Sequence, residues 1–217
     1  MLPVTLGART NMPLRILCLG AHSDDIEIGC GGTVLRLLSE RPGSSVHWVV
    51  FSATEERARE ARESAAEFLA DARTATMEVK SFRESYFPAE WAAIKGFFEE
   101  LRKKVDPDVV LCHQGRDLHQ DHRLLSELTW NTFRSHLVLE YEVPKYEGDL
   151  GTPNFFVPLS RAIADRKVEL LGRHFRSQVS RSWFTPDTFQ GLMSIRGVEC
   201  HAPDGRAEAF TARKVVL

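Results

Sequence analysis

Short apolar runs alternate with longer segments of helical periodicity over the first 130 residues of the chain. Residues 16–19 form a continuous apolar run, and apolar residues recur at helical spacing from Val34 onward. Further strands are predicted over residues 46–51, 75–79 and 109–112, and further helices over residues 55–69, from Pro88 and from the neighbourhood of Asp121. The helix from Pro88 carries an apolar stripe, beginning at Trp91, that is predicted to face the core.

Strands that read as near-continuous apolar runs are typical of a parallel sheet covered by helices on both faces. We therefore predict an α/β fold, a Rossmann-like three-layer sandwich with a mostly parallel sheet. Beyond residue 137 the pattern predicts a strand, a Pro/Gly-rich loop and a helix over residues 160–173, and "EAFTARKVVL" is a last strand or a docked tail. The length predicts that residues 1–217 form a single domain.

The composition argues against several classes of partner and site, but it does not indicate a function. The chain has 43% hydrophobic and 27% charged residues and a formal net charge of −2, which indicates no general affinity for nucleic acid or an anionic membrane. No apolar run approaches the ~20 residues of a membrane span, and the first residues lack the pattern of a secretory signal. The cytoplasm is therefore the expected location. The four cysteines show no CxxC pairing, so a cysteine-based zinc site is not expected.

Two polar clusters follow predicted strands, and both contain residue types that bind metal ions. The first is "GAHSDD" at residues 20–25, and the second is "HQGRDLHQDH" at residues 113–122. In an open parallel sheet, ligands bind outside the carboxyl ends of the strands, so we expect both clusters at one edge. Three protein ligands with one open position are typical of a catalytic zinc site.

A dinucleotide-binding loop is the first alternative for residues 20–33, and the spacing disfavours it. That loop needs G-x-G-x-x-G directly after the strand, whereas Gly29, Gly31 and Gly32 come too late and in the wrong order. Two adjacent carboxylates would also repel a pyrophosphate. The glycines are interpreted instead as the junction between loop and helix, with Gly31 and Gly32 starting the helix.

The segments "LGAHSDDIEIGCGGT" and "PDVVLCHQGRDLHQDH" resemble the LmbE-like, or PIG-L, family of metal-dependent N-acetylglucosamine deacetylases. The hallmarks of that family are an A-H-P-D-D-[AEI]-E-like segment and a later H-x-D-H segment. The resemblance extends through "EYEVP", "TPNFFVPLS", "HFRSQVSRSW" and "AEAF", and so spans nearly the whole chain. The family fold agrees with the pattern above. Ser23 departs from the family, which usually has proline there.

The resemblance implies roles for individual residues. It makes His22, Asp25 and His122 the ligands of a zinc ion, with ferrous iron as an alternative. Asp24 would be the general base for a zinc-bound water. The resemblance further implies that His119 stabilises the oxyanion or protonates the leaving amine. Asp121 would orient His119. The implied reaction removes the N-acetyl group from an N-acetylated amino sugar or its conjugate, a small-molecule partner. Relatives also often form homo-oligomers.

Other readings stay open. A metal-dependent amidase or esterase acting on a non-sugar substrate would use the same chemistry, and a nucleotide- or metal-binding module would use none. Asp24 or Asp25 is also compatible with a simple helix cap, and Asp121 with the N-cap of the helix after the fourth predicted strand. His113 is either a partner of the metal ligands or packed in the core. Arg57 or Arg59 would hold the sugar or lie on a solvated helix face, and His174 is a weak candidate for the pocket border.

Overall fold

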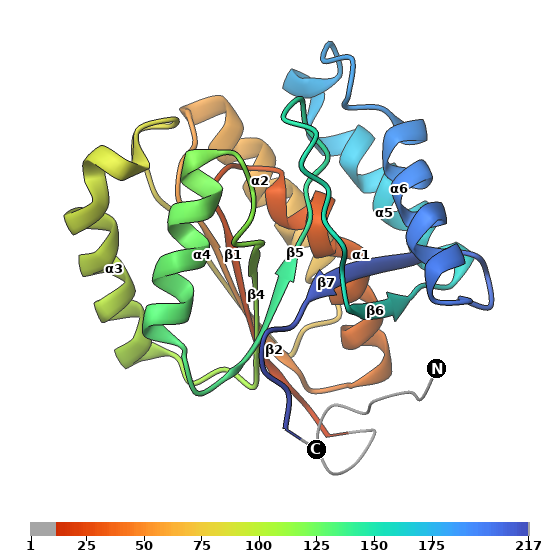
Figure 1. Cartoon of the computed structure of the whole chain (residues 1–217), viewed down its shortest axis with the longest axis horizontal. Helices are drawn as coiled ribbons and strands as arrows, with labels where there is room; N and C mark the ends of the chain where they lie inside the picture. The colour runs from red at the N-terminus through yellow and green to blue at the C-terminus, as the bar shows by residue number, and fades with distance from the viewer. Residues whose placement is uncertain (1–11, 217) are drawn as a thin grey trace.

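A seven-stranded sheet in the order β3-β2-β1-β4-β5-β7-β6 runs through the computed structural model, which describes residues 12–216 (Figure 1). The strands are β1 (Arg15–Gly20), β2 (Ser45–Val50), β3 (Thr74–Val79), β4 (Val109–His113), β5 (Leu137–Tyr141), β6 (Phe155–Pro158) and β7 (Ala207–Thr211). Strands β1 to β5 pair in parallel, whereas β7 is antiparallel to both β5 and β6. The predicted fold class is confirmed. The beginning of the chain, where no secretory signal was predicted, lies outside the described residues.

Helices cover both faces of the sheet and enclose two hydrophobic cores. One face carries α1 (Asp25–Glu40), α2 (Glu55–Phe68), α5 (Arg161–His174) and α6 (Pro186–Glu199). The other face carries α3 (Trp91–Lys104) and α4 (Gln120–Thr132); the short 3-10 turns are η1 (Phe87–Glu90) and η2 (Arg176–Gln178). Within β1, Ile16 and Cys18 join the first core while Leu17 and Leu19 join the second. Burial on both faces explains the unbroken apolar run of this strand.

Helix α1 begins at Asp25, so the prediction that Gly31 and Gly32 start it was wrong. These glycines lie inside the helix, where they permit close packing. A Cβ atom at Gly29 would lie 2.1 Å from the ring of Tyr141, and one at Gly31 would lie 2.7 Å from Phe68. Glycine in a sequence suggests a break, but here it removes the side chain that would separate the helix from its neighbours.

Two side chains from the C-terminal part of the chain hold the middle of α1. Glu208 of β7 accepts hydrogen bonds from the backbone N–H groups of Gly32 and Thr33, at 2.8 and 2.6 Å. Lys167 of α5 donates to the carbonyl of Ile28 and to Glu208, both at 2.6 Å. Both side chains are 3% exposed. This pair, Lys167 and Glu208, is called the α1 clamp below, and it fixes the helix that directly follows the first polar cluster.

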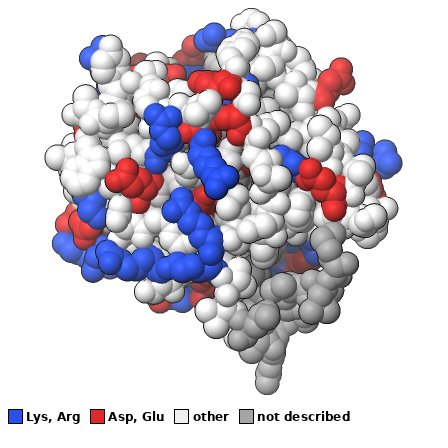
Figure 2. Space-filling view, in the orientation of Figure 1, with Lys and Arg blue, Asp and Glu red and all other residues white. Residues whose placement is uncertain are grey.

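Sequence patterns were weakest where apolar residues face solvent. Strand β6 and helix α6 were not predicted, and α6 exposes Ile195 and Val198 while it buries Phe189 and Met193. Trp91, predicted to face the core, is 44% exposed. No helix within residues 12–216 has the length and apolar character needed to cross a membrane. Lys and Arg side chains lie among Asp and Glu side chains on the face shown in Figure 2, which agrees with the small net charge.

Candidate active site

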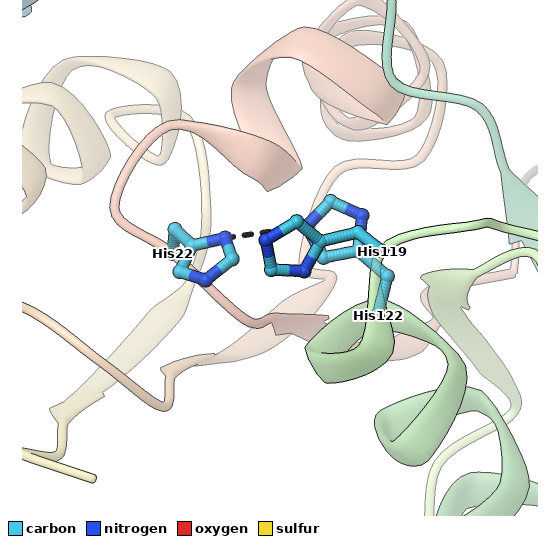
Figure 3. Close-up of side chains that lie close together, drawn as sticks. All are labelled: His22, His119 and His122. Atoms are coloured by element: carbon cyan, nitrogen blue, oxygen red, sulfur yellow. Dashed lines mark hydrogen bonds between the residues drawn. The ribbon is translucent and has the colours of Figure 1, made fainter. Parts of the chain in front are cut away.

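The two polar clusters meet where β1 and β4 end. These strands are parallel neighbours, so the loop before α1 and the loop before α4 leave the same edge of the sheet. Figure 3 shows His22 reaching in from the first loop, with His119 and His122 approaching from the start of α4. Nδ1 of His22 lies 3.2 Å from Nε2 of His122, although these residues are 100 positions apart.

Three donor atoms of this edge are spaced as the ligands of one metal ion. Besides the contact of His22 with His122, Oδ2 of Asp25 lies 3.3 Å from Nδ1 of His22 and 3.4 Å from Nε2 of His122. A tetrahedral zinc ion with bonds of about 2.0–2.2 Å separates its ligand atoms by about 3.3 Å. The chain therefore brings together the three predicted ligands at a spacing that fits zinc.

Each of these histidines has its second nitrogen next to a carboxylate. Nε2 of His22 lies 3.2 Å from Oδ2 of Asp121, and Nδ1 of His122 lies 3.0 Å from Oδ2 of Asp117. Such carboxylates orient metal-binding imidazoles and leave the other nitrogen free for the ion. Asp121 was expected to orient His119, but its carboxylate faces His22. Asp117 was not predicted at all, although it stands two residues before His119 in the second motif.

Asp121 is itself held by the backbone of the segment before α3. Its Oδ2 accepts the N–H of Ser85 at 2.6 Å and its Oδ1 accepts the N–H of Phe87 at 3.2 Å. Ser85 has a φ of 64°, an uncommon value for a residue with a side chain. These bonds and the contact with His22 keep the pKa of Asp121 below its usual value, against the opposing effect of burial.

The carboxylates around His22 and His122 raise the pKa of each ring. Burial lowers the pKa of His22, but Asp25 and Asp121 outweigh burial and raise this pKa to about 10. The pKa of His122 is also raised, because Asp25 and Asp117 outweigh burial. A metal ion that binds these nitrogens therefore has to displace protons.

Asp24 lies beside the three donor atoms in a different environment. Its side chain is buried, and Oδ1 forms an ion pair of 2.7 Å with Nη2 of Arg57, whereas Oδ2 finds no hydrogen-bond partner within residues 12–216. Burial raises the pKa of Asp24, and the charge of Arg57 offsets only part of this rise. Although Asp24 precedes α1, its side chain forms no capping hydrogen bond, so the reading of Asp24 as a simple side-chain cap is wrong.

His119 caps the start of α4 and faces the ring of His22, with 5.0 Å between the ring centroids. Nδ1 of His119 accepts the backbone N–H of Asp121 at 3.3 Å, which leaves Nε2 to carry the proton of a neutral ring. Burial lowers the pKa of His119, and the charges of His122 and His22 lower it further. These surroundings favour the neutral form of His119, with its proton on Nε2.

His113 lines the site from the end of β4. Its ring stacks on His122 with 3.8 Å between centroids, and Nε2 lies 3.2 Å from Oδ2 of Asp25. Asp25, His113 and His122 thus form another group of close donor atoms, as do His22, His119 and His122. However, Nε2 of His113 already accepts the N–H of Ala21 at 3.0 Å. Burial and His122 lower the pKa of His113 to about 4, so the ring is neutral.

Of the remaining candidate residues, Arg57 lies at the site, whereas Arg59 and His174 do not. Arg57 reaches Asp24 and also donates to Oγ of Ser177 at 3.2 Å, while Arg59 is exposed. His174 pairs with Glu67 of α2 at 3.0 Å rather than with any residue of the site. Ser23 is buried and its Oγ has no partner within residues 12–216, and nothing in the structure explains the serine in place of proline.

The family model described as PIG-L, GlcNAc-PI de-N-acetylase, matches residues 17–133 of the chain. This range includes both polar clusters and ends before the C-terminal segments to which the predicted resemblance extended. A comparison with curated proteins gave no match.

Several solved structures share the fold over most of the chain. A conserved protein of Thermus thermophilus is 21% identical with a TM-score of 0.72, covering 94% of this chain and 96% of its own. The 4-carboxy-2-hydroxymuconate hydratase of Pseudomonas putida is 18% identical with a TM-score of 0.74, covering 94% and 97%. The N,N'-diacetylchitobiose deacetylase of Pyrococcus horikoshii is 19% identical with a TM-score of 0.66, covering 91% and 83%. At these identities the likeness shows the fold alone.

Proposed function

Because the chain belongs to the PIG-L family, we propose that it is a metal-dependent hydrolase that removes the N-acetyl group from an N-acetylated amino sugar or its conjugate. The observation that carries this proposal is the group of three donor atoms from His22, Asp25 and His122, with Asp24 beside them. We assign zinc as the metal because the spacing fits tetrahedral coordination. Ferrous iron would use the same nitrogen and oxygen ligands.

The chain supplies the holding groups for such an ion. His22, Asp25 and His122 would bind it, while Asp121 and Asp117 fix the two imidazole rings. A divalent cation bound there supplies a Lewis acid that polarises the acetamide carbonyl and lowers the pKa of water.

Asp24 and His119 supply the proton chemistry in this proposal. Oδ2 of Asp24 accepts a proton from the attacking water, and Arg57 keeps the other carboxylate oxygen in place. A base with a raised pKa holds that proton long enough to deliver it to the amine nitrogen as the C–N bond breaks. Nε2–H of His119 donates a hydrogen bond to the oxyanion of the tetrahedral intermediate. The products are acetate and a free amine.

Rival reactions remain because the fold itself does not choose one. A similar structure belongs to a diacetylchitobiose deacetylase and another to a hydratase. A metal-dependent amidase or esterase acting on a non-sugar substrate is the second candidate, since the same donor atoms suit hydrolysis of any accessible acyl group.

A substrate panel separates these reactions. Metal-loaded protein is assayed for acetate release from N-acetylglucosamine conjugates, N-acetyl amino acids and acetate esters, and for hydration of an unsaturated dicarboxylate. Acetate release from the sugar conjugates alone is expected. Turnover of acetyl amino acids or esters without turnover of sugars supports the rival hydrolase. Hydration without acetate release contradicts both, and metal binding without any turnover indicates a binding module.

The proposal also includes the location, partners and oligomeric state of the enzyme. We propose that residues 1–217 act as one catalytic domain in the cytoplasm, on a small molecule, without nucleic-acid or membrane partners and as a monomer or homo-oligomer. Sedimentation of the purified protein measures the oligomeric state.

A further inference from the structure

The loop between β5 and β6 is closed at its base by a buried ion pair. Oε1 of Glu142 accepts the N–H of Gly151 at 3.1 Å, so residues 142–151 begin and end at one point. Arg196 of α6 binds both oxygens of Glu142, at 2.6 and 2.9 Å, and donates to the carbonyl of Gly151 at 3.1 Å. In Figure 1 this segment rises above the carboxyl end of the sheet. Residues 142–151 are called the β5–β6 loop below.

Lys145 of the β5–β6 loop lies between two buried carboxylates. Its Nζ donates to Oδ2 of Asp117 at 2.9 Å and to Oδ1 of Asp149 at 2.6 Å. The side chains of Lys145, Asp117 and Asp149 are 9%, 0% and 5% exposed. Oδ2 of Asp149 accepts the N–H of Leu118 at 2.6 Å, and the carbonyl of Asp149 accepts a hydrogen bond from Nε2 of Gln114 at 3.1 Å, so the loop is tied at three points to the turn before α4.

The oxygen of Asp117 that binds Lys145 is also the oxygen that contacts Nδ1 of His122, at 3.0 Å. The other oxygen of Asp117 accepts the N–H of His119 at 2.8 Å. Lys145 therefore supplies, beside the ring of His122, a permanent positive charge to a fully buried carboxylate, and that carboxylate orients one proposed metal ligand and the backbone of His119. A buried carboxylate without its counter-charge is costly, so loss of the lysine charge would let Asp117 move or take up a proton.

We propose that Lys145 is a positioning residue: it holds Asp117, and through Asp117 the ring of His122, and it locks the β5–β6 loop onto the metal-binding turn. The catalytic meaning of this inference rests on the proposed function, whereas the locking of the two segments does not. An isolated surface lysine would have neither effect, because its charge would be solvated.

The decisive variant is Lys145→Met, which keeps an unbranched side chain one atom shorter and removes its charge. Lys145→Arg is the conservative variant, and Lys103→Met is the matched control because Lys103 forms an exposed pair with Glu100 on α3. In metal-free protein, hydrogen exchange is expected to become faster in residues 114–119 and 142–151 of the Lys145→Met variant only. Zinc affinity, measured by chelator competition, is expected to fall roughly 10- to 100-fold, and Lys145→Arg should recover most of it.

Asp149→Asn is the alternative variant for this experiment if Lys145→Met does not fold. This variant removes one of the two carboxylates at Lys145 and should give the same changes at smaller size. Unchanged exchange and unchanged zinc affinity in a folded variant would overturn the inference. If wild-type protein binds zinc but hydrolyses no N-acetylated sugar, the proposed function fails while both measurements still decide the role of Lys145. If wild-type protein binds no zinc, hydrogen exchange alone decides it.

Discussion

Helix α1 contacts two groups of buried charged side chains, one at its middle and one at its first turn. In the α1 clamp, both oxygens of Glu208 have partners: the N–H groups of Gly32 and Thr33 and the ammonium of Lys167. The ammonium also binds the carbonyl of Ile28. The clamp is therefore a closed set in which each charge is matched and hydrogen-bonded.

The first turn of α1 is built differently. Near the start of α1, Ser23 and Asp24 of the preceding loop, Glu27 of the first turn and His113 of β4 each keep one buried polar atom for which residues 12–216 provide no hydrogen-bond partner. Each such atom costs about 1–3 kcal/mol of stability. A cluster that retains several of them has been shaped by a demand other than folding. Within residues 12–216, Oγ1 of Thr33 beside the clamp also lacks a partner, so the charged groups make the difference. Both oxygens of Glu208 are hydrogen-bonded, whereas Asp24 and Glu27 each keep one oxygen without a partner.

Removal of the metal should have the largest effect on activity, because it changes the first turn of α1 and leaves the α1 clamp intact. We expect a chelator, or the change His122→Ala, to reduce acetate release to background, and about one equivalent of zinc to restore the chelated enzyme. Lys167→Met, a change in the clamp, should still bind zinc when folded. Metal content by mass spectrometry and acetate release provide the measurement. Full activity in the chelated protein would refute a metal-dependent reaction.

Zinc affinity in the same experiment should increase with pH. The raised pKa values of His22 and His122 mean that protons compete with the ion for both nitrogens, so binding releases protons and weakens as the pH falls. Calorimetry in buffers of different ionisation enthalpy counts the protons released. An affinity independent of pH would show that these two rings do not bind the ion.

Asp24→Asn tests whether the unsatisfied carboxylate serves chemistry rather than folding. We expect kcat to fall roughly 10²- to 10⁴-fold with metal still bound, because a general base is lost. The free energy of unfolding should stay the same or increase, since a buried carboxylate is neutralised. Kinetics, metal content and urea unfolding of one preparation give all three values. Full activity of the metal-loaded variant would show that Asp24 is not the base.

Changes in the α1 clamp should lower the free energy of unfolding and leave the zinc affinity of the folded protein unchanged. Glu208→Gln leaves Lys167 buried without its counter-charge, so we expect a loss of about 3–5 kcal/mol in the free energy of unfolding. The double variant with Lys167→Met should lose less, because no buried charge is left unpaired. Urea unfolding measures both, with zinc affinity of the folded fraction as the control. A loss equal to that of an exposed pair would contradict the assignment of the clamp as a structural element.

The smallest expected effect concerns Glu27, the buried carboxyl of the first turn. Burial raises its pKa from 4.5 to about 8, and the hydrogen bond from Ser64 reverses only part of this. Between these values the folded protein holds a proton that the unfolded chain releases, so the free energy of unfolding decreases as the pH rises. Glu27→Gln should flatten that slope between about pH 5 and 8. Unfolding midpoints at several pH values in this range test it, and a slope in Glu27→Gln equal to that of the wild-type protein would contradict it.

Features that depend on local pattern were predicted well. The apolar runs identified the parallel strands, and the two motifs placed His22 and His122 at neighbouring strand ends because parallel strands share one edge. The geometry agrees with the predicted ligand set, whose metal-binding role remains a proposal. The start of α1 was missed because glycine is a poor helix former, and only the ring of Tyr141 reveals why Gly29 is needed there.

Features that depend on distant contacts were not accessible from the sequence. Lys145 is an ordinary surface-type residue in a loop until the fold places it against Asp117, 28 positions earlier. The contact of Asp121 with His22, 99 positions apart, likewise has no local signal. Helix α6 was missed because its apolar residues point both inward and outward, as the exposure of Val198 shows.

The α1 clamp also affects how the protein is made. The first polar cluster leaves the ribosome before Glu208, which holds the middle of α1 and lies 176 positions after Gly32. Because glycines make α1 a weak helix on its own, it has to wait for that late residue before it settles against the sheet. A nascent chain in which β7 has not yet been made thus carries both clusters without a firmly placed first turn.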